Sequence, residues 1–117
     1  MKIACLAPSQ VPSTTANSIQ VMKVCQSLVQ IGHTVRLWLP GEQHHPWEQL
    51  AAHYGLTDHF DPTWLRTEPS LKRYDLSVKG VSAARKWGAE ALFTWLPQAA
   101  WLAARIKLPA LLELHDR

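Results

Sequence analysis

A cluster of small polar side chains lies between the first apolar segment of the chain and the first helical one. Ser13, Thr14, Thr15 and Asn17 carry hydroxyl and amide groups, which can hydrogen-bond to a phosphate or to a sugar hydroxyl. A helix that begins here adds free backbone N–H groups and a partial positive charge. The same residue types also favour turns and helix caps in proteins of every kind. The pattern predicts either a ligand-binding loop or a plain turn between a strand and a helix.

Other sequence patterns that would identify a nucleotide or metal site are absent. The chain has no G-x-G-x-x-G, no G-x-x-x-x-G-K-[ST] and no D-x-D sequence. The histidines His44, His45, His53 and His59 lie close together along the chain, but their spacing fits no defined metal site and no cysteine or carboxylate pattern completes it. We therefore expect no bound metal and no resident cofactor.

Length and composition are those of one globular domain over residues 1–117. Apolar residues make up 47% of the chain and charged residues 18%, with a net charge of +3. That balance is compatible with phosphates or an anionic membrane surface, and we do not expect nucleic-acid binding. Cys5 and Cys25 lie in apolar patterns and are predicted to be buried free thiols. No apolar run approaches the about 20 residues needed to span a bilayer, so we expect a cytoplasmic protein, with peripheral contact at the inner membrane face an open alternative.

The elements that would position these residues alternate along the chain. Short runs rich in branched and aromatic residues predict strands, and apolar residues at helical spacing predict helices. Asn17 is expected to cap the first helix, with Gln20 completing a capping box. Alternation of this kind indicates an α/β, Rossmann-like, three-layer domain with a parallel sheet of about five strands and helices on both faces. The predicted strands are 2–8, 34–40, 59–67, 90–95 and 109–116, and the predicted helices are 17–33, 46–55, 69–88 and 97–107.

Ligands of an open parallel sheet bind beyond the carboxyl ends of its strands. Four segments follow the predicted strands and should meet there, namely residues 9–17, 40–45, 96–98 and 115–117. The polar cluster described above is the first of them. Its position favours the ligand-binding interpretation over the plain turn.

The two ends of the chain resemble a known enzyme family. The stretch "PSTTANSIQVMKVCQSLVQIGHTVRLWLP" is similar to the opening of the family 4 glycosyltransferases, in which a P-x-x-x-A-N-S loop precedes a helix that ends in G-H-x-V. The tail "ALLELHD" resembles the strand that closes the family's sheet. The resemblance covers residues 1–40 and 89–117, and the middle of the chain is less specific.

The resemblance implies a fold, an activity and a set of site residues. Family members have the two-domain B-type (GT-B) fold, in which the N-terminal domain binds the acceptor and the C-terminal domain binds a nucleotide-sugar. They transfer a hexosyl-type sugar with retention of configuration, mostly without a metal. By analogy, Ser13, Thr14, Thr15 and Asn17 would face the donor phosphates and the acceptor. The resemblance also makes His115 a catalytic residue beside the reacting sugar, supported by Glu113 and Asp116.

The chain departs from the family pattern in two respects. Many members have a Gly-Gly pair in the first loop, where this chain has serine, threonine and alanine. The donor-binding C-terminal domain, with its two-glutamate motif, is missing, so this chain alone is expected to be inactive. The acceptor would be a carbohydrate or a lipid-linked glycan, with the donor domain in cis or on a separate chain. Two alternatives are a stand-alone, non-catalytic α/β binding module and a flavodoxin-like domain that binds a small phosphorylated ligand.

Tryptophans and lysines offer further interpretations. Trp38, Trp95 and Trp101 fall within predicted elements and are expected to pack in the core. Trp47 and Trp64 are expected to cover the core, with an acceptor groove as the alternative. In the helix that Ser70 is expected to cap, lysines recur every seven residues at Lys72, Lys79 and Lys86. This stripe predicts a solvated face, or alternatively a face that lies on a membrane surface.

Overall fold

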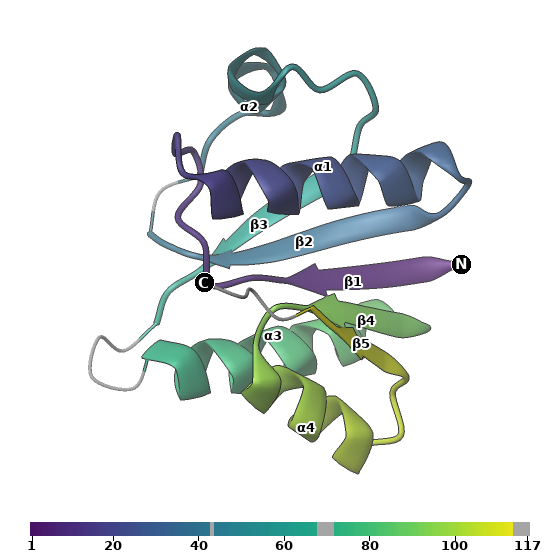
Figure 1. Ribbon diagram of the computed structural model, residues 1–117. Coiled ribbons are helices and arrows are strands. Elements are labelled where there is room, and N and C mark those ends of the chain that lie inside the picture. The colour runs from purple at the N-terminus through teal and green to yellow at the C-terminus, as the bar shows by residue number, and fades with distance from the viewer. Residues whose placement is uncertain (43, 68–71, 114–117) are drawn as a thin grey trace.

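The computed structural model describes residues 1–42, 44–67 and 72–113, and within these it shows a parallel sheet with helices on both faces (Figure 1). The sheet has five strands in the order β3-β2-β1-β4-β5, and every neighbouring pair is parallel. The predicted Rossmann-like α/β fold is confirmed. The elements in chain order are β1 (Lys2–Leu6), α1 (Ala16–Gln30), β2 (Thr34–Pro40), α2 (Trp47–Tyr54), β3 (Asp61–Leu65), α3 (Lys72–Trp87), β4 (Ala91–Thr94), α4 (Pro97–Arg105) and β5 (Ala110–Leu112).

The sheet separates two apolar cores. Helices α1 and α2 cover one face and α3 and α4 cover the other (Figure 1). Alternate residues of β1 point to opposite faces, so that Cys5 packs with Met22 of α1, whereas Leu6 packs with Leu76 of α3. All four of these side chains are fully buried. The near-continuous apolar sequence of β1 is therefore the expected sequence of a strand that is covered on both faces.

The first helix begins two residues earlier than the capping prediction requires. Thr15, and not Asn17, is the N-cap, since its side-chain oxygen accepts a hydrogen bond from the N–H of Ser18. The predicted capping box is wrong, because the Gln20 side chain bonds to Glu113 instead. The C-terminal end is as predicted. Gly32 has a φ of +103° and lies in a pair of N–H to C=O bonds typical of the Schellman motif.

The weak third strand is present and lies at an edge of the sheet. Pro62 lies within β3, and it is tolerated there because an edge strand pairs on one side only. The opposite edge is formed by β5, which has three residues. The expected cap Ser70 and the last part of the predicted fifth strand, residues 114–116, lie outside the described residues. Within the described part of the chain, no helix has the length and apolar character needed to cross a membrane.

Candidate functional site

The order of the strands places the switch point of the sheet between the carboxyl ends of β1 and β4. These two strands are neighbours, and the chain leaves them in opposite directions, to β2 through α1 and to β5 through α4. Open α/β sheets bind ligands at such a switch point. Two connections begin at this switch point, namely the loop from residue 7 to residue 15, here called the β1–α1 loop, and the short β4–α4 connection. The loop that carries the polar cluster therefore starts at the switch point of the sheet.

A buried threonine connects β4 to β1 at the switch point. The Thr94 hydroxyl donates to the Leu6 carbonyl oxygen over 2.8 Å, and its oxygen accepts from the Leu96 N–H over 3.1 Å. Thr94 is fully buried, so both bonds are shielded from water. They fix the β4–α4 connection relative to the end of β1.

Two of the four predicted loop residues use their hydroxyls within the loop itself. The Ser13 hydroxyl oxygen accepts from the Thr15 N–H over 3.1 Å and lies 3.2 Å from the Thr15 hydroxyl. The Thr15 oxygen in turn caps α1 at Ser18 over 3.3 Å. Thr14 and Asn17 are exposed, and their side chains form no hydrogen bond to any described residue. The plain-turn interpretation thus accounts for Ser13 and Thr15, whereas Thr14 and Asn17 face solvent.

Side chains from far along the chain hold the loop in place. The Tyr54 hydroxyl accepts from the Ser13 N–H over 2.8 Å and also hydrogen-bonds to the Ser18 hydroxyl. His53 Nε2 lies 3.0 Å from the Ser13 carbonyl oxygen. Trp64 Nε1 donates to the Val11 carbonyl oxygen over 3.1 Å. We call Tyr54, His53 and Trp64 the loop brace.

Sequence reasoning missed the loop brace. Its hydrogen bonds join residues 36 to 53 positions apart, a separation at which periodicity and capping patterns carry no information. The expectation that Trp64 covers the core is correct in part, because Trp64 is buried while its ring nitrogen positions the loop. The brace makes the loop a fixed surface, and a preformed surface loses less entropy when it binds a ligand.

The first turn of α1 leaves backbone donors free beside this fixed loop. The N–H groups of Ala16 and Asn17 have no hydrogen-bond partner among the described residues, since Ser18 bonds to the Thr15 side chain and Ile19 to the Thr15 carbonyl. Both residues are exposed. Free N–H groups and the positive end of the helix dipole together attract anions. Chemically, this end of α1 can receive a phosphate.

Of the two predicted supporting residues, Glu113 lies within the described part of the chain. Its side chain contacts α1 at Gln20. Its N–H donates to the Thr94 carbonyl over 2.9 Å, which continues the pairing of β5 with β4. Its Oε1 accepts from Gln20 Nε2 over 2.7 Å. Its other carboxylate oxygen is buried and has no partner among the described residues. A buried carboxylate oxygen of this kind can accept a hydrogen bond from a ligand hydroxyl.

The Glu113 carboxylate lines a groove between α1 and the sheet. The groove has a volume of about 610 Å³, and Ala16, Gln20 and Phe93 also line it. The Glu113 side chain contacts α1 at Gln20, the fifth residue of the helix. Its role at a functional site stays a prediction.

His115 and Asp116 lie outside the described residues, so their predicted roles stay predictions. In the described ranges, no group of three or more histidine, cysteine, aspartate or glutamate side chains could hold a metal ion. His44 and His45 instead pack edge-on against Trp64, with ring centroids 5.7 and 5.4 Å from it.

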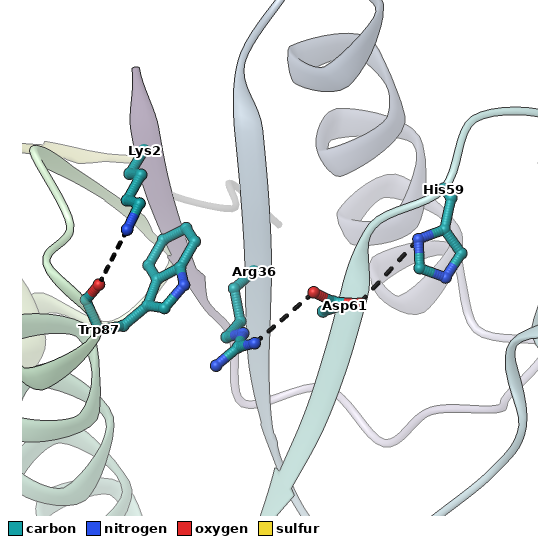
Figure 2. A network of polar contacts seen from close by, with 5 residues as sticks. All are labelled: Lys2, Arg36, His59, Asp61 and Trp87. Atoms are coloured by element: carbon teal, nitrogen blue, oxygen red, sulfur yellow. Dashed lines mark hydrogen bonds and ion pairs between the residues drawn. The ribbon is translucent and has the colours of Figure 1, made fainter.

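Figure 2 shows a second polar cluster, which lies toward the amino ends of the strands, where Lys2 begins β1 and Asp61 begins β3. Arg36 lies 3.6 Å from the Asp61 carboxylate, and His59 Nδ1 lies 4.0 Å from the same side chain. Lys2 donates to the Trp87 carbonyl over 3.4 Å, and both Lys2 and Arg36 contact the Trp87 ring. Half-exposed pairs of this kind contribute little to stability. We assign the cluster a structural role in joining α3 to the sheet.

The two cysteines are buried free thiols, as predicted. Burial raises the pKa of the Cys25 thiol well above its usual range, and the hydrogen bond with Cys5 raises it further. A thiol held in its protonated form is a poor nucleophile. Cys25 therefore packs between α1 and β1 as a protonated thiol.

Comparison with known proteins shows the fold alone. The whole chain superposes on part of apo UGT2 from Phytolacca americana, a plant UDP-glycosyltransferase, with a TM-score of 0.65 and 17% sequence identity. The chain spans 30% of that protein's length. It also superposes, over 98% of its length, on the C-terminal domain of a hydrogenase from Pyrococcus furiosus, with a TM-score of 0.56 and 16% identity. Comparison with protein-family models gives no match, and comparison with curated proteins gives none either. The chain thus has a Rossmann-like fold that a GT-B glycosyltransferase also contains.

Proposed function

We propose that this chain is the N-terminal, acceptor-binding domain of a glycosyltransferase that moves a sugar from a nucleotide-sugar to a carbohydrate or lipid-linked acceptor. One observation supports this function above the others. The free N-terminus of α1 lies at the switch point of a sheet that superposes over its full length on part of a plant UDP-glycosyltransferase. The resemblance of the loop sequence and of the E-L-H-D tail to the family agrees with that position.

Each site residue has a proposed role in this function. The N–H groups of Ala16 and Asn17 receive the donor phosphates, and the exposed side chains of Thr14 and Asn17 contact the donor or the acceptor. The unpaired oxygen of Glu113 accepts a sugar hydroxyl. His115, with Asp116 beside it, contacts the reacting sugar. The donor nucleotide is held mainly by a second domain, so this chain alone binds it weakly and does not turn over.

The phosphate role can be tested by removing one backbone donor. In Ala16→Pro the N–H disappears, yet proline is well tolerated at the first helical position, and Thr15 already has the extended conformation that precedes a proline, with φ −69° and ψ 149°. We expect UDP titration followed by amide NMR to move the Asn17 and Ser18 signals, and Ala16→Pro to weaken binding about tenfold, as for the loss of a hydrogen bond to a charged group.

A matched variant separates the backbone from the side chain. Asn17→Ala keeps the N–H and removes only the side-chain amide, so it should weaken UDP binding less than Ala16→Pro does. Equal UDP affinity for Ala16→Pro and the unchanged chain would refute the phosphate role. Binding in the micromolar range by this chain alone would instead favour a stand-alone module for a phosphorylated ligand.

Sugar transfer itself is tested on the native protein. An immunoblot of the source cells is expected to show a band of roughly 40 kDa, as two domains of ordinary size require. That protein should transfer labelled sugar from a nucleotide-sugar, and His115→Ala should abolish the transfer while its folding stays intact. A band near the 13.2 kDa of this chain, with no transfer in any fraction, would contradict the proposal.

A further inference from the structure

The outer surface of α3 and α4 exposes large apolar side chains that face no other described element. Tyr74 is 65% exposed, Val78 56%, Trp101 60% and Ile106 37%. Trp101 was expected in the core, and the structure contradicts that expectation. The two helices pack side by side on one face of the sheet (Figure 1). Their exposed residues therefore form one continuous surface, which we call the α3–α4 face.

Two shallow hollows join these residues into a single patch. One hollow, of about 350 Å³, is lined by Val78, Trp101 and Ile106 together with Arg85 and Arg105. The other, of about 390 Å³, shares Val78 and Trp101 with the first and adds Tyr74. Contiguous exposed apolar surface on a folded protein usually marks a place of interaction.

The charges at this patch have one sign. Arg85 and Arg105 are both exposed, and the Arg105 guanidinium lies 5.0 Å from the centre of the Trp101 ring. No described residue that lines either hollow is acidic. The nearby Asp75 carboxylate is paired with Lys79 over 3.2 Å. The partner that fits this face is therefore apolar at its centre and anionic at its rim.

We propose that the α3–α4 face binds the surface of an anionic lipid membrane. Tryptophan and tyrosine prefer the interface between hydrocarbon and water, and arginine beside them pairs with lipid phosphates. Two helices that lie side by side present a broad face. A broad face can lie on a membrane surface, whereas a narrow groove would fit a single partner helix. The proposed site does not use the stripe of Lys72, Lys79 and Lys86. The Lys79 amine pairs with Asp75 and donates to the Arg66 carbonyl oxygen.

The proposal does not depend on the sugar-transfer function. It uses neither the β1–α1 loop nor the groove beside Glu113, and its test measures lipid binding alone. A chain that binds membranes but fails every transfer assay would leave this proposal standing. Conversely, an active transferase that ignores lipid would refute this proposal and leave the other intact.

Vesicle sedimentation tests the proposal directly. We expect this chain to sediment with vesicles that contain about one third phosphatidylglycerol in phosphatidylcholine, and to sediment less as salt is raised, because the charges are screened. Replacing both arginines, in Arg85→Gln with Arg105→Gln, should weaken binding about 30-fold, the effect of two cations near such a surface. Trp101→Ser should weaken binding to the same vesicles by removing the apolar contact.

The controls separate this face from non-specific attraction. Ile31→Ser removes an apolar side chain that is 71% exposed at the end of α1, and Arg66→Gln removes an exposed cation paired with Glu42. Neither should change sedimentation, and circular dichroism confirms that all variants fold. Failure to bind anionic vesicles at low salt would refute the proposal, as would equal losses in the control variants. Recruitment of an acidic peptide with no lipid binding would identify the face as a protein-docking site instead.

Discussion

Thr15 is the last residue of the β1–α1 loop and the N-cap of α1. Its side-chain oxygen contacts both elements. That oxygen accepts from Ser18 and lies within hydrogen-bond distance of the Ser13 hydroxyl. A cap of this kind satisfies one of the N–H groups that a helix leaves unpaired at its start. The free donors of the site therefore depend on a residue that does not itself need to touch the ligand.

Removing the cap should cost measurable stability. We expect Thr15→Ala to lower the free energy of unfolding by about 1 kcal/mol, as is usual for a lost N-cap. Thr14→Ala is the matched control, because the neighbouring threonine is exposed and has no side-chain hydrogen bond to a described residue; it should change stability by less than about 0.5 kcal/mol. Urea denaturation measures both, and equal effects would contradict the assignment of the cap.

The buried Cys25 thiol should make stability depend on pH. The pKa of the thiol is raised in the folded state, mainly by burial. In the unfolded chain its pKa is about 8.5. Below that pH both states keep the proton and the stabilisation is fully present. Above it the unfolded state releases the proton and the folded state does not, so folding stability falls as pH rises.

Urea denaturation at pH 7 and at pH 10, under reducing conditions, checks this. Other groups titrate in the same range, so the measured quantity is the difference between the unchanged chain and Cys25→Ala. From pH 7 to pH 10 the unchanged chain should lose more unfolding free energy than Cys25→Ala does. An unchanged difference would show that Cys25 ionises equally easily in both states.

Sequence reasoning at the residue scale found the polar cluster but assigned the helix cap to Asn17, whereas Thr15 is the N-cap. Asn17 and Thr15 are both good N-cap residues, and the pattern after them does not say which one begins the helix. The choice depends on Ser13 and on Tyr54, which hold the loop so that the Thr15 oxygen faces the Ser18 N–H. A contact between residues 13 and 54 leaves no trace in a local pattern.

Among the elements, α3 approaches β1 more closely than a side chain would allow. A Cβ on Gly80 would lie 2.5 Å from one methyl carbon of Leu6 and 2.6 Å from the other. Leu6 is fully buried, so its side chain cannot turn into solvent to make room. The glycine in mid-helix, which costs about 1 kcal/mol of helix propensity relative to alanine, is explained by this contact.

Gly80→Ala is therefore expected to destabilise the protein. Overpacking costs about 1–3 kcal/mol and outweighs the gain in helix propensity, so the net loss should be about 1 kcal/mol in thermal or urea unfolding. Ser82→Ala, at an exposed position of the same helix, should be nearly neutral. In a Leu6→Ala background, Gly80→Ala should lose its penalty, and additive effects would contradict the proposed contact.

The alternation of elements was predictable because strands and helices differ in their apolar period. Even β3 was found in spite of Pro62, since edge strands accept proline. The function of α2 was not predictable. Its eight residues read only as a short helix, yet Tyr54 at its end holds the loop of the candidate site.

Over the whole molecule, the strands differ in how many neighbours protect them. β1 pairs on both sides and is covered on both faces. Among the described residues β5 pairs with β4 alone, and its Ala110 and Leu111 are exposed. Local stability follows such differences, because poorly covered segments open more easily than the core.

Hydrogen exchange should show this gradient. We expect the amides of β1 to exchange only on global unfolding, and those of β5 to exchange at least about tenfold faster, which corresponds to an opening that costs about 1.4 kcal/mol less. The amides of β4 act as an internal reference, since that strand pairs on both sides. Equal protection of β1 and β5 would show that the sheet opens as one unit.

The loop brace links two parts of the chain that the sheet keeps apart. Because Tyr54 and His53 of α2 and Trp64 of β3 hold the β1–α1 loop, the loop is braced only in a state in which α2 and β3 are docked. By thermodynamic linkage, a ligand that binds the ordered loop also draws α2 into its docked position. Ligand binding at the β1–α1 loop should therefore slow the hydrogen exchange of amides in α2, which lies more than thirty residues further along the chain.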